Sequence, residues 1–136
     1  MAFTSLEDAE VDVDIIPGTV ITATAGAAIK AGQTVYLSAD KTVKPQDNTT
    51  EPIVYDDTIG VAAYDVASGE KVGIYSVGSI VRTRWSGGTS ASAGDWVWGS
   101  TGGFVRSGTY TNSGCGFAQL MKAPTANEGI VEIFIH

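Results

Sequence analysis

Short runs of β-branched, aromatic and aliphatic residues recur along this chain, and polar turns that contain glycine separate them. Runs of about four to eight such residues between turn signals are typical of β-strands. The chain has few long stretches of strong helix formers, which favours an all-β fold. The pattern predicts strands at residues 19–24, 34–38, 42–44, 59–64, 71–75, 79–83, 95–98, 116–121 and 130–135.

The order of these motifs partly repeats in the second half of the chain. The run AGQTVY at residues 31–36 is echoed by AGDWVW at 93–98, and GVA at 60–62 is echoed by GFA at 116–118. Two further segments, 41–44 and 69–75, have counterparts at 102–106 and 127–133.

We therefore expect two pseudo-repeated β units, at about residues 19–85 and 90–136. Residues 86–92 are rich in serine and glycine, and we interpret them as a flexible linker between the copies. Together the units would form one compact, barrel-like or sandwich-like β domain over residues 16–136.

Residues 1–15 differ in character from the rest of the chain. Five of the fifteen acidic residues lie within eight positions, at residues 7–14, and valine alternates with aspartate from Val11 to Asp14. The alternation favours an extended segment, while five like charges oppose compact packing. We expect an extended acidic N-terminal arm. Two interpretations stay open: a solvated terminus, or an arm that orders on a neighbouring subunit or partner with Phe3 and Leu6 as apolar anchors.

Two groups of cationic and aromatic side chains are candidates for contacts between subunits. Arg82 and Arg84 alternate on one predicted strand, just before Trp85, in a chain with few cations. They lie on a solvated face, or they meet carboxylates across an interface, where arginine and tryptophan are enriched. Trp96 and Trp98 share one face of the next predicted strand. The alternatives for this pair are core packing, a platform for stacking sugar rings, and an oligomer contact.

Length and charge narrow the functional classes. With 136 residues, of which 43% are hydrophobic, the chain can bury a core as a single domain. Its formal net charge of −7 repels a phosphate backbone, so we expect no nucleic-acid binding. The first residues lack the features of a signal peptide, and no apolar run approaches the roughly 18 residues that cross a bilayer. We expect cytoplasmic synthesis and no membrane partner.

The residues that catalysis or metal binding requires are scarce. His136 is the one histidine and the last residue, and Cys115 is the one cysteine, which we expect to be buried. One of each builds neither a Ser/His/Asp or Cys/His arrangement nor a zinc site. Asp56 and Asp57 have no further ligand at metal-site spacing, so we interpret them as solvated turn residues. We expect no enzyme activity, no cofactor and no metal.

The doubled layout and its motifs resemble the small head decoration, or capsid cement, proteins of tailed bacteriophages. The likeness covers about residues 19–136, and the order and doubling of the motifs are more specific than any single one of them. The matching motifs are AGQTVYL at 31–37, KTVKP at 41–45, IGVA at 59–62, ASGEKV at 67–72, VGSIV at 77–81, AGDWV at 93–97 and GFA at 116–118.

The resemblance implies a β-rich homotrimer on the outer surface of the expanded capsid, synthesised in the host cytoplasm and assembled into the virion. Its partners would be the major capsid protein and further copies of itself, and its role would be to stabilise the head. The arm would contact the coat through Phe3, Leu6, Glu7, Asp8, Val11 and Val13. The candidates for the trimer interface are Arg82, Arg84, Trp85, Trp96 and Trp98.

A second function class stays open from the sequence, a carbohydrate-binding or cell-surface-binding β module displayed on a virion. In that module Trp85, Trp96 and Trp98 would stack on sugar rings. A hydrolase is the third alternative, and it needs a buried pair of carboxylates in a cleft.

Overall fold

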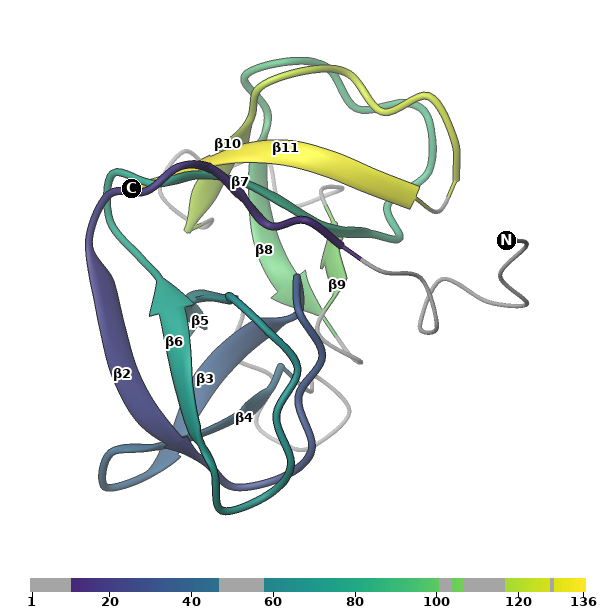
Figure 1. Ribbon diagram of the computed structural model, residues 1–136. Coiled ribbons are helices and arrows are strands. Elements are labelled where there is room, and N and C mark those ends of the chain that lie inside the picture. The colour runs from purple at the N-terminus through teal and green to yellow at the C-terminus, as the bar shows by residue number, and fades with distance from the viewer. Residues whose placement is uncertain (1–10, 47–57, 101–103, 107–116, 128) are drawn as a thin grey trace.

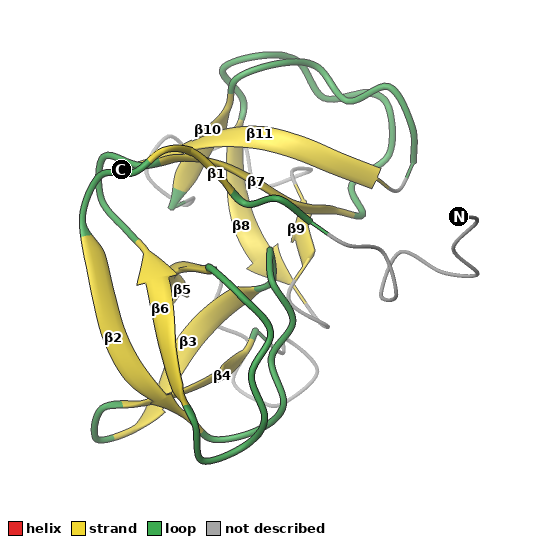
Figure 2. Cartoon of the chain, viewed as in Figure 1, coloured by secondary structure: helices red, strands yellow, loops and turns green. Residues whose placement is uncertain are grey.

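The structure is a computed structural model that describes residues 11–46, 58–100, 104–106, 117–127 and 129–136. These residues form eleven β-strands and no α-helix (Figure 2), which confirms the predicted all-β class. The strands are β1 (Asp14–Ile16), β2 (Val20–Ala25), β3 (Thr34–Ala39), β4 (Thr42–Pro45), β5 (Thr58–Ala62), β6 (Lys71–Tyr75), β7 (Ile80–Trp85), β8 (Trp96–Ser100), β9 (Phe104–Arg106), β10 (Ala118–Leu120) and β11 (Gly129–Ile135).

The first barrel contains β2 to β6 and forms the lower half of the molecule in Figure 1. Its strands pair in the order β2-β4-β3-β5-β6, and β6 returns to β2, which closes the ring. The closing pair of β2 and β4 is parallel and joins Thr24 to Thr42 and Ala25 to Val43. Side chains alternate along each strand, and those that point inward form a core of Ala23, Ala25, Ile29, Val35, Val43, Ala62, Val72 and Ile74.

The second barrel repeats this strand order. Its ring runs β7-β9-β8-β10-β11, and β11 returns to β7. The closing pair is again parallel, between Trp85 of β7 and Val105 of β9. The two related β units predicted from the sequence are therefore confirmed. The second core contains Val13, Ala31, Val61, Val81, Trp85, Ala91, Val97, Phe117, Ala118, Leu120, Val131, Ile133 and Ile135.

The boundary between the units differs from the predicted one. The sequence motifs assign β7 to the first copy, but β7 pairs with β11 along its whole length and lies in the second ring. The units therefore run from β2 to β6 and from β7 to β11. Residues 86–92, expected to link the copies, connect β7 to β8 within the second barrel. Local patterns identify strands, whereas only the pairing partners identify the ring to which a strand belongs.

Backbone carbonyls of the first barrel hold β7 in place. The Thr83 hydroxyl donates a hydrogen bond to Gly32 O at 2.7 Å, and Arg84 Nε donates to Ala31 O at 3.1 Å. Arg84 is only 2% exposed, and a buried charge is tolerated where hydrogen bonds satisfy it. Gly32 has a φ of 83°, which favours glycine, and a Cβ there would lie 3.0 Å from a methyl group of Val11, which would have to shift.

The segment before β2 completes the second barrel. β1 pairs antiparallel with β7, with Ile16 opposite Ile80, and Arg82 N donates a hydrogen bond to Val13 O at 2.8 Å. The Val13 side chain is 3% exposed and belongs to the second core. This edge of β7 is therefore covered by a segment that the sequence assigned to the arm.

Arg82 also anchors the same segment from its side chain. Its Nη1 donates hydrogen bonds to the backbone oxygens of Asp12 and Asp14, at 3.0 and 3.4 Å. Residues 14–16 are extended, but residues 11–15 pack on the barrel and do not project from it as an arm. The free energy gained by burying the Val13 side chain exceeds the cost of repulsion among the nearby carboxylates. Residues 1–10 lie outside the described residues.

Two of the differences between the observed and the predicted strand ends illustrate how tertiary contacts set them. β5 ends at Ala62, two residues early, and the Tyr64 hydroxyl accepts a hydrogen bond from Gly73 N at 3.0 Å. β7 continues beyond residue 83 to Trp85, because Gly129 of β11 pairs with Trp85. The first involves a neighbour nine residues further along the chain, and the second a strand that is distant in the sequence.

Replacing Val13 with alanine should lower the free energy of unfolding by about 1.5–3 kcal/mol, because two buried methyl groups leave the second core. Equilibrium unfolding in urea measures this loss. Val77→Ala is the matched control: Val77 is 58% exposed, and the same change there should stay within about 0.5 kcal/mol. Equal losses in the two variants would contradict the packing of residues 11–16.

Tyr75 makes the stability sensitive to alkaline pH. Burial, and then the carboxylates of Asp14 and Asp12, raise the pKa of Tyr75 above its ordinary value of 10.0. Because this raised pKa belongs to the folded state, the associated stability is complete below about pH 10 and is lost as the pH rises through the folded pKa. The unfolding free energy should fall more steeply above about pH 10 in the wild type than in Tyr75→Phe. Urea unfolding at a series of alkaline pH values measures both slopes, and parallel slopes would rule out this role for Tyr75.

Candidate interaction surface

A continuous row of side chains crosses the outer face of the second barrel, and the strand register sets it. Ile80 of β7 lies between Ile16 of β1 and Phe134 of β11. Gln119 of β10 lies between Phe134 and Trp96 of β8. Because neighbouring strands are about 4.8 Å apart, five side chains in register form a band about 19 Å long. Four of the five side chains are apolar and Gln119 is polar, and we call these five residues the apolar band.

The apolar band faces outward because the adjacent residues on the same strands face the core. Val81, Ile133 and Val97 point inward and are fully buried. In the band, Ile16 is 55% exposed and Phe134 is 38% exposed, while the other members are half-buried. Exposed apolar side chains that gather on one face are typical of a surface that binds another macromolecule.

His136 joins the aromatic end of the band. Its ring lies 4.9 Å from that of Phe134, stacked at 16°, and 4.8 Å from that of Trp96, tilted at 42°. His136 Nε2 forms a hydrogen bond of 2.7 Å with Gln119 Oε1, and Gln119 Nε2 donates to Gly94 O at 2.9 Å. These contacts hold exposed side chains in one arrangement, which reduces the entropy that a binding partner would have to remove.

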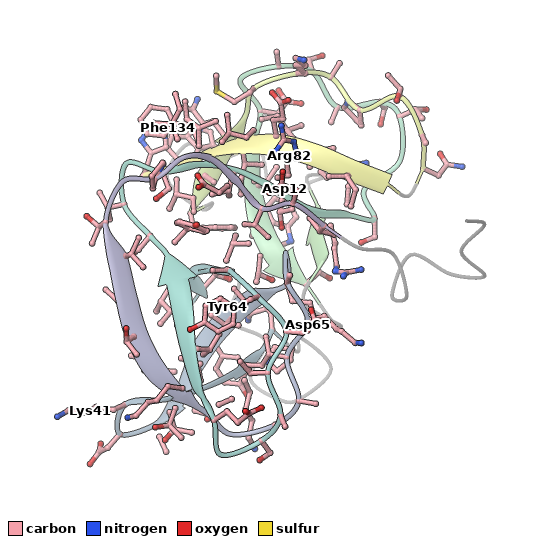
Figure 3. The ribbon with its side chains drawn as sticks, in the orientation of Figure 1. Asp12, Lys41, Tyr64, Asp65, Arg82 and Phe134 are labelled. Carbon is pink, nitrogen blue, oxygen red and sulfur yellow. The ribbon has the colours of Figure 1, made fainter. Side chains whose placement is uncertain are left out.

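A row of alternating charges borders the apolar band. Arg82 Nη1 lies 3.8 Å from Asp12 Oδ2, and Figure 3 shows the two side chains next to each other. Arg82 also lies opposite Glu132 in the strand register, and Glu132 Oε1 is 3.8 Å from Lys122 Nζ. Such partly exposed pairs contribute about 0–1 kcal/mol to stability. They contribute more to orientation, because alternating charges favour one register of a partner over others.

Three of the five residues predicted for a subunit interface are buried within the chain. Trp85 is 1% exposed, and its Nε1 donates a hydrogen bond to Gly88 O at 2.8 Å. Trp98 and Arg84 are 3% and 2% exposed. Burial leaves little of these three side chains for a neighbouring subunit or a sugar, so they are corrected as contact candidates, and for Trp98 the core-packing alternative holds. The alternation seen in the sequence does not reveal that the first barrel covers the end of β7 at Ala31.

The other two interface candidates, Arg82 and Trp96, are partly exposed. Trp96 is a member of the apolar band. Arg82 belongs to the charged row, and the segment at Asp12 and Asp14 engages its guanidinium.

Of the residues predicted to contact the coat, the structure describes Val11 and Val13 but not the four before residue 11. Val13 is buried in the second core, so its side chain is not available to a partner, and Val11 is half-buried against the same core. This corrects the prediction for Val13, whose side chain packs in the core, whereas the contact predicted for Val11, which lies against Gly32, stays a prediction. The remaining candidates lie outside the described residues: Phe3, Leu6, Glu7 and Asp8.

The sequence prediction did not single out Phe134, Ile80, Ile16 or His136. A signal was present for Phe134, since Glu132 marks the solvent face of the last strand and Phe134 shares that face. No such local signal joins Ile16 to Ile80, because their proximity comes from the pairing of β1 with β7.

The described part of the chain holds neither a metal-binding cluster nor a membrane-spanning helix. No group of three or more His, Cys, Asp or Glu side chains there could hold a metal ion. No helix in the same residues has the length and hydropathy of a bilayer span. Asp56, Asp57 and Cys115 lie outside the described residues.

The fold is similar to that of a solved phage protein. A scan against protein-family models and a search of curated proteins found no match. Among solved structures, the head fiber gp8.5 N base of bacteriophage phi29 aligns with a TM-score of 0.57 and 17% identity, over 87% of this chain and 93% of that one. The fold described above is therefore shared over nearly the whole length of both chains.

Trp96 should account for the tryptophan fluorescence that acrylamide quenches readily, because Trp85 and Trp98 are buried. Trp96→Phe should remove the readily quenched fraction, while the control Trp98→Phe should leave it in place. Stern–Volmer plots of the wild type and both variants measure the effect. Strong quenching that persists in Trp96→Phe would mean that Trp85 or Trp98 is accessible to solvent.

Proposed function

We propose that this chain is a structural protein of a tailed-bacteriophage head that decorates the outer surface of the capsid. The observation that carries the proposal is the fold shared with the phi29 head-fibre base, over 87% of this chain and 93% of that one. The sequence motifs, which resemble head decoration proteins, support it from a separate direction. A decoration protein needs a stable scaffold with exposed surfaces for association, and the two barrels with their apolar band have this form.

The proposed assembly is a homotrimer whose copies meet through the apolar band. Phe134 and Trp96 are the proposed anchors, because large aromatic side chains near the centre of an interface contribute most to binding. The charged row that includes Arg82 would lie at the rim and set the register between copies.

Trimer formation would give capsid attachment its strength. A trimer presents three identical binding sites at once. After one site binds a coat subunit, the other two face the lattice at high effective concentration, so weak contacts add up. Attachment that favours the expanded lattice over other states stabilises that lattice by mass action. No bond is made or broken in this function, so binding surfaces alone suffice for it.

The proposed partner of the N-terminal arm is the major capsid protein. Since Val13 belongs to the second core, we limit the contact region to residues before 11, with Phe3, Leu6, Glu7 and Asp8 as its candidates. The proposed site of action is the outer surface of the virion, and we propose neither a nucleic acid nor a membrane as a partner.

The carbohydrate-binding alternative loses two of its three stacking rings. Trp85 and Trp98 are 1% and 3% exposed, so neither can present a ring face to a sugar. The ring centroid of Trp96 lies 4.8 Å from that of His136, which favours a packed protein contact over an open stacking platform for sugars.

Phe134→Glu tests the role of the apolar band. This variant should be monomeric and should lower capsid occupancy about tenfold or more, because each copy would have to desolvate a carboxylate at the interface. Leu37→Glu is the matched control, since Leu37 is 54% exposed on β3 of the first barrel, and it should keep both properties. Light scattering measures the oligomer mass, and co-sedimentation with expanded heads of the phage that encodes the protein measures occupancy.

Deleting residues 2–10 separates trimer formation from attachment. The deletion should leave the trimer intact and abolish head binding, because the core residue Val13 is retained. A monomeric wild type would reject the trimer, and full occupancy after the deletion would reject the arm. A wild-type protein that never sediments with heads would reject the decoration role itself.

A further inference from the structure

The two barrels share one strand order but differ at one strand edge. In the second barrel, β1 covers the edge of β7 that faces away from β11, and Arg82 N donates to Val13 O at 2.8 Å. The corresponding edge of the first barrel belongs to β2, which lies at the outer margin of the molecule in Figure 1. In the part of the chain that the structure describes, no strand pairs with this edge before Thr24.

The closing parallel pairs show which positions of the two barrels correspond. β2 meets β4 at Ala25, and β7 meets β9 at Trp85. Residues at equal distances before these two points therefore occupy equivalent places on β2 and β7. The matched positions are Thr22 with Arg82 and Val20 with Ile80, which are the places on β7 that β1 covers.

Val20 and Thr22 direct their backbone groups at the open edge. Thr24 N donates a hydrogen bond to Lys41 O in the turn before β4, and Ala25 N donates one to Glu70 O in the turn before β6, each at 2.8 Å. Successive N–H groups of a strand point to opposite edges, so Val20 and Thr22 point the same way as Thr24, away from β6. Among the described residues, neither N–H has a hydrogen-bond partner. Unpaired N–H and C=O groups on a strand edge are a template for a further strand.

The segment that covers the matching edge of β7 indicates which kind of strand fits. Residues 11–16 read Val-Asp-Val-Asp-Ile-Ile, with apolar and acidic side chains in alternation. Val13 enters the core, while Asp12 stays outside, 3.8 Å from Arg82. On β2 the neighbouring outward side chains are also accessible, since Val20 is 52% exposed and Thr22 is exposed.

Lysine side chains gather at the end of β2 beyond the open edge. Lys71 Nζ donates a hydrogen bond to Thr24 Oγ1 at 3.2 Å, and Figure 3 shows Lys41 extending from the neighbouring turn. Three of the five lysines of this chain, whose net charge is −7, lie here. The charged residues of this end are Lys41, Lys44 and Lys71 against Asp40 and Glu70. The local excess of positive charge attracts acidic segments.

We propose that the open edge of β2 at Val20 and Thr22 binds an extended, acidic segment of a partner protein by antiparallel β-strand addition. The guest strand pairs with the two N–H and two C=O groups of these residues, as β1 pairs with β7. Its acidic side chains lie toward the lysines, and its apolar side chains alternate with them. This surface is separate from the apolar band, and the proposal does not depend on a role at a phage head.

The test uses the full chain labelled with ¹⁵N and a capped peptide of the sequence Val-Asp-Val-Asp-Ile-Ile, which is that of residues 11–16. Addition of the peptide should shift the amide signals of Val20 and Thr22 and slow their hydrogen exchange. Thr22→Pro removes one edge N–H that the fold itself does not use, and it should weaken binding about tenfold. Thr22→Val keeps that N–H and should bind like the wild type.

A second peptide tests the charge requirement. With lysine in place of both aspartates, binding should be about fivefold weaker, because the lysines at the end of β2 repel it. If Thr22→Pro does not keep the wild-type unfolding midpoint, Val20→Pro applies the same block at the neighbouring edge position.

Three results would overturn the proposal. The first is a saturating peptide titration that leaves Val20 and Thr22 unmoved and shifts only Arg82 and its neighbours, since this reports displacement of β1. The second is protection of Val20 and Thr22 that grows with protein concentration without peptide, which assigns the edge to a second copy of this chain. The third is equal binding by Thr22→Pro and Thr22→Val.

Discussion

The backbone pairing between the segment at Val13 and the edge of β7 at Arg82 is the contact on which the second barrel depends. β11 covers one edge of β7, but β9 reaches the other edge only at Trp85. The segment at Val13 covers the remainder and supplies a buried side chain to the core. The same pairing places Ile16 beside Ile80, and thereby extends the apolar band across one more strand.

The doubled scaffold acquires different surfaces from one strand order. In the second barrel the strand register lines up Phe134, Gln119 and Trp96 on the outer face, where neighbouring side chains hold them in place. In the first barrel, Thr22 is the position that corresponds to Arg82, and among the described residues no strand pairs with β2 there. The first of these surfaces suits side-chain packing and the second suits backbone pairing.

Sequence reasoning was most successful where a residue's position depends on its immediate neighbours. The strand at residues 71–75 was predicted with its observed bounds, and the doubling of the motifs matches two rings of identical order. It was less successful for Arg84, Trp85 and Trp98, which were candidates for an interface and are buried; for Trp98, core packing was one of the alternatives left open. Arg84 is buried because the carbonyl of Ala31 accepts its hydrogen bond across the junction between barrels.

The sequence by itself determined the strands, the turns between them and the fact that one β unit is present twice, because side-chain alternation and turn chemistry act over a few residues. Tertiary structure alone decided which strands share a ring, that Val13 is a core residue, and that Phe134 stands beside Ile80 on an outer face. The physical reason is that register and burial arise from pairing between distant segments. A local pattern specifies that a strand has two faces, but the strands that pack against it determine which face water reaches.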